Sequence, residues 1–272
     1  MTFRCVLAYL AERVKLLQAR LASGVEGVKR LSQKAQEWAR QKAAQKALLP
    51  VELRKYAGQG LDEAKLKAAY EAASDKARFL ADLDKAQTVY AKRELIRDFD
   101  NIPGVAKGKN PRNGLKDAIT YTDRLGRKNP ALDLPDKEAA NFTEAQAVHL
   151  KPGTKLYRVV GGSARDTGGY WVTAESLPKG YGDVIGGTAV KPAWGNGMTE
   201  IIEYTVPKEG MVVWEGPAAS QSIGTPSSTS RHLPGGGKQI DIPEVYRDYK
   251  RPDVLKKFEG NITKRNPINW KK

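Results

Sequence analysis

The sequence has few of the residues that metal sites and disulfides need. Its one cysteine, Cys5, excludes an internal disulfide framework, and its two histidines are too few for a zinc site of cysteine and histidine ligands. No apolar run approaches the roughly 18 residues that a membrane-spanning helix requires. The best candidate, Val6–Ala11, is followed by Glu12 and Arg13 and lacks a small-residue cleavage site. It therefore predicts a helix and not a signal peptide.

Several enzyme motifs are also missing. Gly180 and Gly182 are followed by Gly186, one residue too late for the G-x-G-x-x-G phosphate loop, and no helix signal opens there. The chain has neither a Walker phosphate loop nor a G-x-S-x-G nucleophile elbow. A Ser-His-Asp triad would have to use His149 or His232, and no local motif supports either.

Positive charge is in excess along the whole chain. There are 46 basic and 31 acidic residues, a net charge of +15. Residues 1–150 carry 28 basic and 19 acidic residues, and residues 151–272 carry 18 and 12. Such a protein is attracted to nucleic acid, to anionic membranes and to acidic partners. The net charge does not select among these partners, because a surface of mixed charges with a basic excess is also found on proteins where it only interacts with solvent.

The first part of the chain reads as helical and the last part as strands and turns. Residues 1–150 hold 8 of the 26 glycines, and the other 18 lie in residues 151–272. Apolar residues at helical spacing predict a helix over residues 3–47 and another from Leu61 or Asp62 to about Asp98. Turn signals predict a linker over 101–145, with one short helix over Leu115–Leu125. A further short helix is expected over Glu144–His149, capped by Thr143.

Five short runs predict strands in the last part. They cover Lys155–Val160, Tyr170–Thr173, Glu200–Val206, Gly210–Glu215 and Lys238–Ile242, and the third and fourth are expected to pair as a hairpin. Without long helices between them, such strands favour an antiparallel or mixed sheet. The predicted fold class is α+β, with a helical bundle or hairpin over 1–100, a linker over 101–145 and a compact β-rich domain over 146–272.

Three segments of the last part carry candidate site residues. Arg158 lies in the middle of a strand, where it either faces solvent or binds an anion in a cleft. Tyr170 and Trp171 follow two glycines and either stack on a planar ring or pack in the core. Three consecutive glycines precede Lys238 and Gln239 and are costly to order, so they suit a loop that wraps a ligand or a mobile turn.

In this order, the segments resemble the NAD-glycohydrolase toxin domain of the tuberculosis necrotizing toxin type, found at the C-termini of bacterial polymorphic toxins. The resemblance covers about residues 150–245. The matching pieces are Arg158; Gly169-Tyr170; Tyr204-Thr205-Val206; Gly216-Pro217-Ala218-Ala219 with Gln221; and Pro234-Gly235-Gly236-Gly237-Lys238-Gln239.

This resemblance implies hydrolysis of NAD(P)+ at the nicotinamide–ribose bond, on a fold akin to the ADP-ribosyltransferases. It also implies that activity needs Gln239 and that Arg158 and Tyr170 line the site. The family prototype carries a histidine on the Tyr-x-Val strand, where this chain has Ile202. The role of that histidine is either absent here or taken by Glu200 or Glu203, because a carboxylate can stabilise an oxocarbenium-like ribose.

The site predicted from the sequence combines these residues. Its catalytic residues are Gln239, Arg158, Glu203 and Glu200, and its dinucleotide-binding residues are Tyr157, Tyr170, Trp171, Trp194, Gly236 and Gly237. No metal or further cofactor is expected, since NAD+ or NADP+ is the substrate. The resemblance implies a secreted or injected toxin, made in a bacterial cytoplasm and active in that of a target cell. A cognate immunity protein is the implied partner, and the helical part would meet a secretion apparatus or chaperone.

Three other functions stay open at this stage. An ADP-ribosyltransferase would use the same chemistry with a macromolecular acceptor. A nuclease or nucleic-acid-binding protein would use the net charge and the basic tail, with His232 as its best acid or base. A structural adaptor with a helical arm would need no site at all.

Overall fold

A computed structural model describes residues 36–37, 49–224, 231–268 and 270. The chain divides into two compact units, Met1–Ala57 and Gly58–Lys272. In the first unit a 3₁₀ helix, η1, covers Val51–Tyr56. The helix predicted over residues 3–47 lies outside the described residues except for 36–37, which are helical. Among the described helices, none has the length and apolar character to cross a bilayer.

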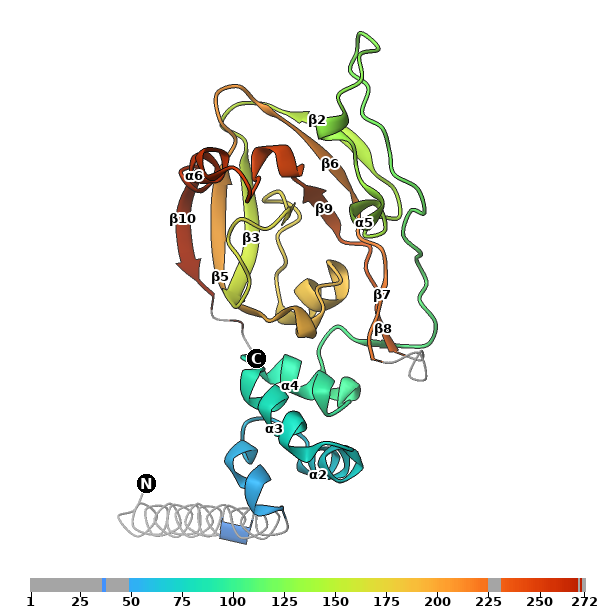
Figure 1. The fold of residues 1–272 in the computed structure, drawn as a ribbon, viewed down its shortest axis with the longest axis vertical. Coiled ribbons are helices and arrows are strands. Elements are labelled where there is room, and N and C mark those ends of the chain that lie inside the picture. The colour runs from blue at the N-terminus through green and yellow to red at the C-terminus, as the bar shows by residue number, and fades with distance from the viewer. Residues whose placement is uncertain (1–35, 38–48, 225–230, 269, 271–272) are drawn as a thin grey trace, which may run out of the picture. The chain divides into compact units, whose positions relative to one another are not determined.

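Three short helices replace the single long helix predicted up to Asp98. They are α2 (Glu63–Ala72), α3 (Lys76–Lys85) and α4 (Val89–Leu95), followed by the 3₁₀ helix η2 (Phe99–Asn101) (Figure 1). Each α-helix has an N-cap side chain that accepts a hydrogen bond from a backbone N–H within the first turn. The caps are Asp62, Asp75 and Thr88. Such caps begin new helices and interrupt a continuous one, so the long helix was a wrong prediction.

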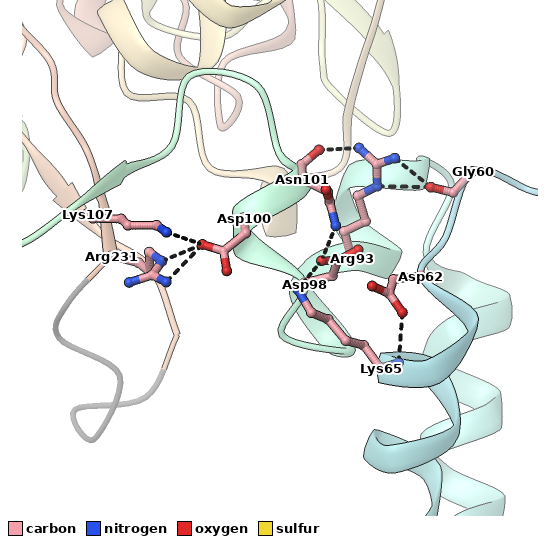
Figure 2. A network of polar contacts seen from close by, with 9 residues as sticks. All are labelled: Gly60, Asp62, Lys65, Arg93, Asp98, Asp100, Asn101, Lys107 and Arg231. Atoms are coloured by element: carbon pink, nitrogen blue, oxygen red, sulfur yellow. Dashed lines mark hydrogen bonds and ion pairs between the residues drawn. The ribbon is translucent and has the colours of Figure 1, made fainter.

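Polar contacts tie this helical segment together and to the β-rich part (Figure 2). Asp98 is fully buried and accepts hydrogen bonds from Lys65 Nζ at 2.7 Å and from Asn101 Nδ2 at 2.6 Å. Two residues further, Asp100 pairs with Arg231 at 2.8 Å. Arg231 begins strand β8 (Arg231–Leu233), so the helical and strand regions form one folded unit.

In the residues that the structure describes, ten strands form three antiparallel sheets (Figure 1). The orders are β10–β5–β3, β2–β6–β9–β4 and β1–β8–β7. The strands are β1 (Ala106–Lys107), β2 (Gln146–Leu150), β3 (Lys155–Gly162), β4 (Tyr170–Trp171), β5 (Asn196–Thr205), β6 (Met211–Pro217), β7 (Gln221–Ser222), β8 (Arg231–Leu233), β9 (Lys238–Asp241) and β10 (Ile262–Pro267). The remaining helices are η3 (Pro130–Leu132), α5 (Asp136–Ala139), the π-helical η4 (Asp183–Gly187), η5 (Pro192–Trp194), η7 (Glu244–Tyr246) and α6 (Pro252–Glu259).

The predicted α+β class with antiparallel strands is confirmed, and all five predicted strands are present. The predicted hairpin is wrong, because β5 pairs with β3 and β10 while β6 pairs with β2 and β9. The short connection that contains Pro207 therefore passes from one sheet to another. A single antiparallel bridge between Tyr157 and Val172 links these two sheets through β3 and the end of β4. The likeness to ADP-ribosyltransferases stays a prediction.

The segment predicted as a linker packs against the second sheet. Ile119 bridges Leu134, and Phe142 bridges Ala218, so no helix forms over Leu115–Leu125. The helix predicted over Glu144–His149 is also wrong, since β2 occupies most of that range. Pairing with β6 prevails there over the local helix signal. Leu134, Ala139, Phe142 and Trp214 form a small buried cluster.

The main core lies between the sheets and α6. Trp171, Tyr204 and Phe258 meet there, with Tyr204 stacked on Phe258 at 4.6 Å between ring centroids. A second core joins η2 to the segment around η4. It contains Phe99, Ile102, Val159, Val184, Ile185, Ala189, Met198, Ile223 and Leu233. Helix α4 extends it, because Tyr90 stacks on Tyr181 at 4.3 Å.

Candidate functional site

One cavity of about 280 Å³ brings most of the predicted site residues together. Its walls come from β3, the segment 163–196 around η4 and η5, and the starts of β7 and β9. The predicted residues that line it are Arg158, Gln239, Tyr157, Tyr170, Trp171 and Trp194. The lining also contains Asn141, Val159, Ser163, Ala164, Arg165, Val172, Pro178, Val184, Thr188, Ala189, Val190, Asn196, Ala219 and Gln221.

Arg158 is turned into the protein. Along β3 it shares a face with Leu156 and Val160, which belong to the main core. Its Nη1 donates to the carbonyl of Tyr170 at 2.6 Å, while its Nε is buried and has no hydrogen-bond partner among the described residues. A Cβ on Gly168 would lie 2.3 Å from Nη2, so this glycine makes room for the guanidinium. Of the two sequence alternatives, the solvent-facing arginine is excluded.

The cavity is electropositive. Burial lowers the pKa of Arg158 to about 10, so the side chain remains a cation at neutral pH. Arg165 also lines the cavity, whereas none of the described lining residues is an aspartate or glutamate. A guanidinium with an unused N–H in such surroundings suits an anionic oxygen ligand such as a phosphate.

Gln239 lies on β9 and is only 5% exposed. Its Nε2 donates to the backbone carbonyl of Asn141 at 2.8 Å. Because it borders the cavity, its amide can reach a bound ligand while staying uncharged.

Asn141 is a site residue that the sequence did not reveal. Its Nδ2 donates to the hydroxyl of Tyr170 at 2.7 Å, and its Oδ1 accepts from Gln221 Nε2 at 3.1 Å. It therefore contacts three cavity side chains, those of Tyr170, Gln221 and Gln239. No local signal could have found it, because it lies in a segment whose turns resemble a linker.

Tyr170 serves as a hydrogen-bond donor and not only as a ring. Its hydroxyl donates to the Glu138 carboxylate on α5. Burial raises the pKa of Tyr170 above its ordinary value, and the nearby Asp241 and Glu138 raise it further. The hydroxyl thus keeps its proton.

The triple glycine shapes the cavity, although neither Gly236 nor Gly237 is among its lining residues, and the binding roles predicted for both stay predictions. Gly235 and Gly236 have φ of 69° and 89°, in the left-handed region that favours glycine. Gly235 N–H donates to the carbonyl of Gly186 at 2.7 Å, and Gly237 N–H to that of Gly187 at 2.8 Å. The segment thereby holds η4, and with it one cavity wall, against the start of β9.

The two predicted tryptophans lie in different environments. Trp171 is 1% exposed, and its Nε1 donates to the carbonyl of Gly168 at 2.8 Å. Its ring packs in the main core and also borders the cavity, and the stacking role predicted for it stays a prediction. Trp194 is 54% exposed at the cavity rim, where a planar ring could reach it.

The two predicted carboxylates do not reach the cavity. Strand alternation puts Glu203 on the opposite face of the sheet from Arg158 and Ile202. There its carboxylate binds Lys155 Nζ at 2.9 Å. Burial raises the pKa of Tyr157, and the nearby Glu203 carboxylate raises it further. Tyr157 thus borders the cavity, while its hydroxyl interacts with the Glu203 carboxylate.

Glu200 lies on β5, the central strand of the same sheet, and its carboxylate is engaged by the edge strand β10. Arg265 on β10 bonds both Glu200 and Asp166. Neither this carboxylate nor Glu203 is among the residues that line the cavity, and the catalytic roles predicted for both stay predictions.

A second, smaller cavity has a volume of about 190 Å³. Asp241 and Glu138 line it together with Arg247. Asp241 is 2% exposed, and its Oδ1 has no hydrogen-bond partner within the described part of the chain, with Arg247 Nη2 at 3.8 Å. Burial, reinforced by Glu138, raises the pKa of Asp241 to about 8.

Other candidate chemistry is sparse in the described residues. Within these ranges, no three His, Cys, Asp or Glu side chains gather as the ligands of a metal ion would. His232 is buried, its Nδ1 lies 2.9 Å from the carbonyl of Gly108, and it lines neither cavity. This position does not suit the acid or base role that a nuclease would need.

Comparisons with known proteins give only distant structural matches. No family model matches the chain, and no curated protein matches its sequence. A solved structure of Tne2 in complex with Tni2 is 13% identical, with 36% of this chain and 80% of that chain covered and a TM-score of 0.27. A structure of Rhs1-CT in complex with its cognate immunity protein RhsI1 is 19% identical, with 46% and 77% covered and a TM-score of 0.23. At these scores neither match assigns a fold or a function.

Proposed function

We propose that the protein hydrolyses NAD(P)+ at the nicotinamide–ribose bond. The observation that carries this proposal is that Arg158, Tyr170 and Gln239 meet at one cavity, although Gln239 lies far from the other two in the sequence. These residues belong to the segments on which the resemblance to NAD glycohydrolases rests. Convergence of such segments is expected of a site and is not required by core packing alone.

The charge of the cavity supports a dinucleotide substrate. Arg158 has a buried Nε–H without a partner in the described residues, and Arg165 adds a second guanidinium. Two cations in a lining without a described carboxylate can bind the pyrophosphate by charge-assisted hydrogen bonds. Trp194 at the rim offers an exposed ring for the nicotinamide or adenine.

The reaction needs little acid or base from the protein. Nicotinamide leaves as a neutral molecule with the electron pair of the C–N bond, and the ribose carbon passes through an oxocarbenium-like state. Water then adds to that carbon and gives a proton to solvent. Gln239 has the means to orient this water or the ribose, because its amide both donates and accepts hydrogen bonds.

The test is release of nicotinamide and ADP-ribose from NAD+ or NADP+ by the full chain. We expect equal amounts of both products, and at least about a hundredfold loss of rate in Gln239→Ala, as for other groups aimed at a transition state. Gln146→Ala, at an exposed residue of β2, is the matched control. Full turnover by folded Gln239→Ala would contradict the assigned site.

Two other outcomes favour the alternatives. Transfer of labelled ADP-ribose to a macromolecule, without free ADP-ribose, would indicate a transferase. No turnover, together with salt-dependent RNA binding, would favour a nucleic-acid-binding function.

The proposal includes a biological role as a secreted or injected antibacterial toxin. Depletion of NAD(P)+ harms any cell that holds the active enzyme, so a producing cell needs a cognate immunity protein. The cavity mouth, with the exposed Trp194, is the surface on which such a partner would act.

A further inference from the structure

Two glutamines converge on one asparagine at the cavity wall. Gln239 on β9 and Gln221 on β7 both line the cavity. Gln239 Nε2 donates to the backbone carbonyl of Asn141 at 2.8 Å, and Gln221 Nε2 donates to its side-chain Oδ1 at 3.1 Å. One residue thus holds both amide nitrogens.

The direction of these hydrogen bonds is determined by acceptors that cannot donate. Asn141 Nδ2 donates to the backbone carbonyl of Lys137 at 3.1 Å and to the Tyr170 hydroxyl at 2.7 Å. Tyr170 in turn gives its own proton to Glu138. The oxygen of the Asn141 amide therefore faces Gln221, which must present its nitrogen.

Both glutamine oxygens consequently point away from Asn141. In the part of the chain that the structure describes, no donor reaches Oε1 of Gln221 or of Gln239. Neither oxygen is among the buried polar atoms that lack a partner. Each oxygen is therefore an unused acceptor on a residue that borders the cavity.

We propose that Gln221 is a second catalytic glutamine. Gln221 and Gln239 each accept one of the two hydrogen bonds that the attacking water donates, and Asn141 positions Gln221. This inference rests on the NAD(P)+ hydrolysis proposed above. A water molecule donates two hydrogen bonds, so two acceptors held by one residue fix its orientation and turn a lone pair toward the ribose carbon. The water oxygen forms the new C–O bond, the C–N bond breaks with its electron pair on nicotinamide, and the proton passes to solvent water.

The first test replaces Gln221 by leucine, which keeps the bulk and removes the amide. We expect kcat for nicotinamide release to fall about tenfold or more while KM for NAD+ changes less than about threefold, because the water and not the dinucleotide is misplaced. Gln146→Leu is the matched control on the exposed part of β2.

A second readout separates a water-binding role from a structural one. Methanol added to the reaction competes with water and yields methyl ADP-ribose. Loss of an acceptor for the second water hydrogen should raise the ratio of methyl ADP-ribose to ADP-ribose in Gln221→Leu. This ratio does not depend on the fraction of folded enzyme.

The role of Asn141 is tested by combining substitutions. Asn141→Ala removes the side-chain contact to Gln221 and keeps the backbone carbonyl that holds Gln239. We expect Asn141→Ala to lower kcat in the wild-type background and to have no further effect on Gln221→Leu. If Gln221→Leu does not fold, Gln221→Asn, which keeps the amide but withdraws it by one methylene, takes its place in each assay.

The outcomes are distinct. An unchanged kcat and product ratio in folded Gln221→Leu, or additive losses in the double variant, would overturn the inference and leave NAD(P)+ hydrolysis standing. No nicotinamide release by the wild-type chain would overturn the proposed function itself, and this inference with it.

Discussion

Asp241 and Arg158 are both ionisable side chains inside the protein, and their surroundings affect them differently. Arg158 keeps its charge because its pKa, lowered by burial to about 10, is still well above neutral. Asp241 lies beside Glu138, a second carboxylate, and Arg247 Nη2 is 3.8 Å from it. Its pKa of about 8 means that Asp241 is mostly protonated at neutral pH.

The raised pKa of Asp241 predicts a loss of stability with rising pH. The unfolded chain loses this proton near the ordinary pKa of 3.8, while the folded protein keeps it until about 8. The folded state thus binds more protons between these values, and its stability falls across that window by at most about 1.4 kcal/mol per pH unit from this group. Asp241→Asn should flatten this dependence.

Urea unfolding of wild type and Asp241→Asn at several pH values between about 5 and 8 measures the effect as a difference of slopes. Asp136→Asn makes the same chemical substitution at an exposed aspartate on α5 and serves as the control. Equal slopes in wild type and Asp241→Asn would contradict the prediction.

At the scale of elements, the glycine-rich segment before β9 shows how backbone contacts build the site. Gly235 lies against Ala218 and Ala219, and a Cβ there would come within 2.5 Å of the Ala218 carbonyl oxygen. Its left-handed φ and this close approach both require glycine. The glycine segment therefore holds η4 in place by backbone hydrogen bonds. Strand β9 begins directly after this segment, and Gln239 near its start borders the cavity.

Gly235→Ala should destabilise the protein much more than a glycine substitution in open space. Gly153 has a similar φ of 80°, but a Cβ added to it would meet no described atom within 4 Å, so Gly153→Ala costs about 1 kcal/mol from backbone strain. Gly235→Ala adds a clash with backbone, and we expect about 2 kcal/mol or more beyond that. Urea unfolding of both variants measures the difference, and equal losses would show that the close approach relaxes freely.

The same elements show what the sequence could and could not predict. Strands such as β3 and β5 were predictable because short β-branched and aromatic runs end at turn residues. Their partners were not, since nothing local to β5 says that it pairs with β10 and β3 rather than β6. Alternation along the strand puts Glu203 on the opposite face from Ile202, but which of these two faces borders the cavity depends on the pairing of β5.

The site was predictable where a residue lies within a distinctive segment and not where it depends on contacts distant in sequence. Arg158 and Gln239 belong to recognisable segments, and both line the cavity. Asn141 is 98 residues from Gln239 and lies in no motif. Only the folded structure joins the two.

At the scale of the molecule, α4 and η2 form part of the support for the cavity. Phe99 and Ile102 pack in one cluster with Val184 and Ile185. Burial raises the pKa of Glu94, whose carboxylate accepts a hydrogen bond from the backbone N–H of Ala193 in η5. The cavity-lining segment around η4 and η5 thus packs on residues that the sequence assigned to a separate helical region.

This packing predicts how the chain responds to truncation. A chain that begins at Gly58, where the second compact unit begins, should keep its melting temperature within about 3 °C and should retain nicotinamide release. A chain that begins at Val105 lacks Phe99 and Ile102, whose burial is worth about 1.5–3 kcal/mol each, and exposes their partners. Together with the loss of Tyr90 on Tyr181, this is comparable to the whole stability of about 5–15 kcal/mol of a typical domain.

The shorter chain should therefore fail to unfold cooperatively in thermal melts monitored by circular dichroism, and it should release no nicotinamide. Phe99→Ala in the full chain is the companion variant and should cost about 3–5 kcal/mol, as for other buried aromatic residues. If the chain from Val105 melted and turned over like the full chain, the helices would be separable, and the boundary near residue 100 predicted from the sequence would be correct. If only the chain from Gly58 did so, the catalytic unit would include all three helices, because its cavity wall needs α4 to stay in place.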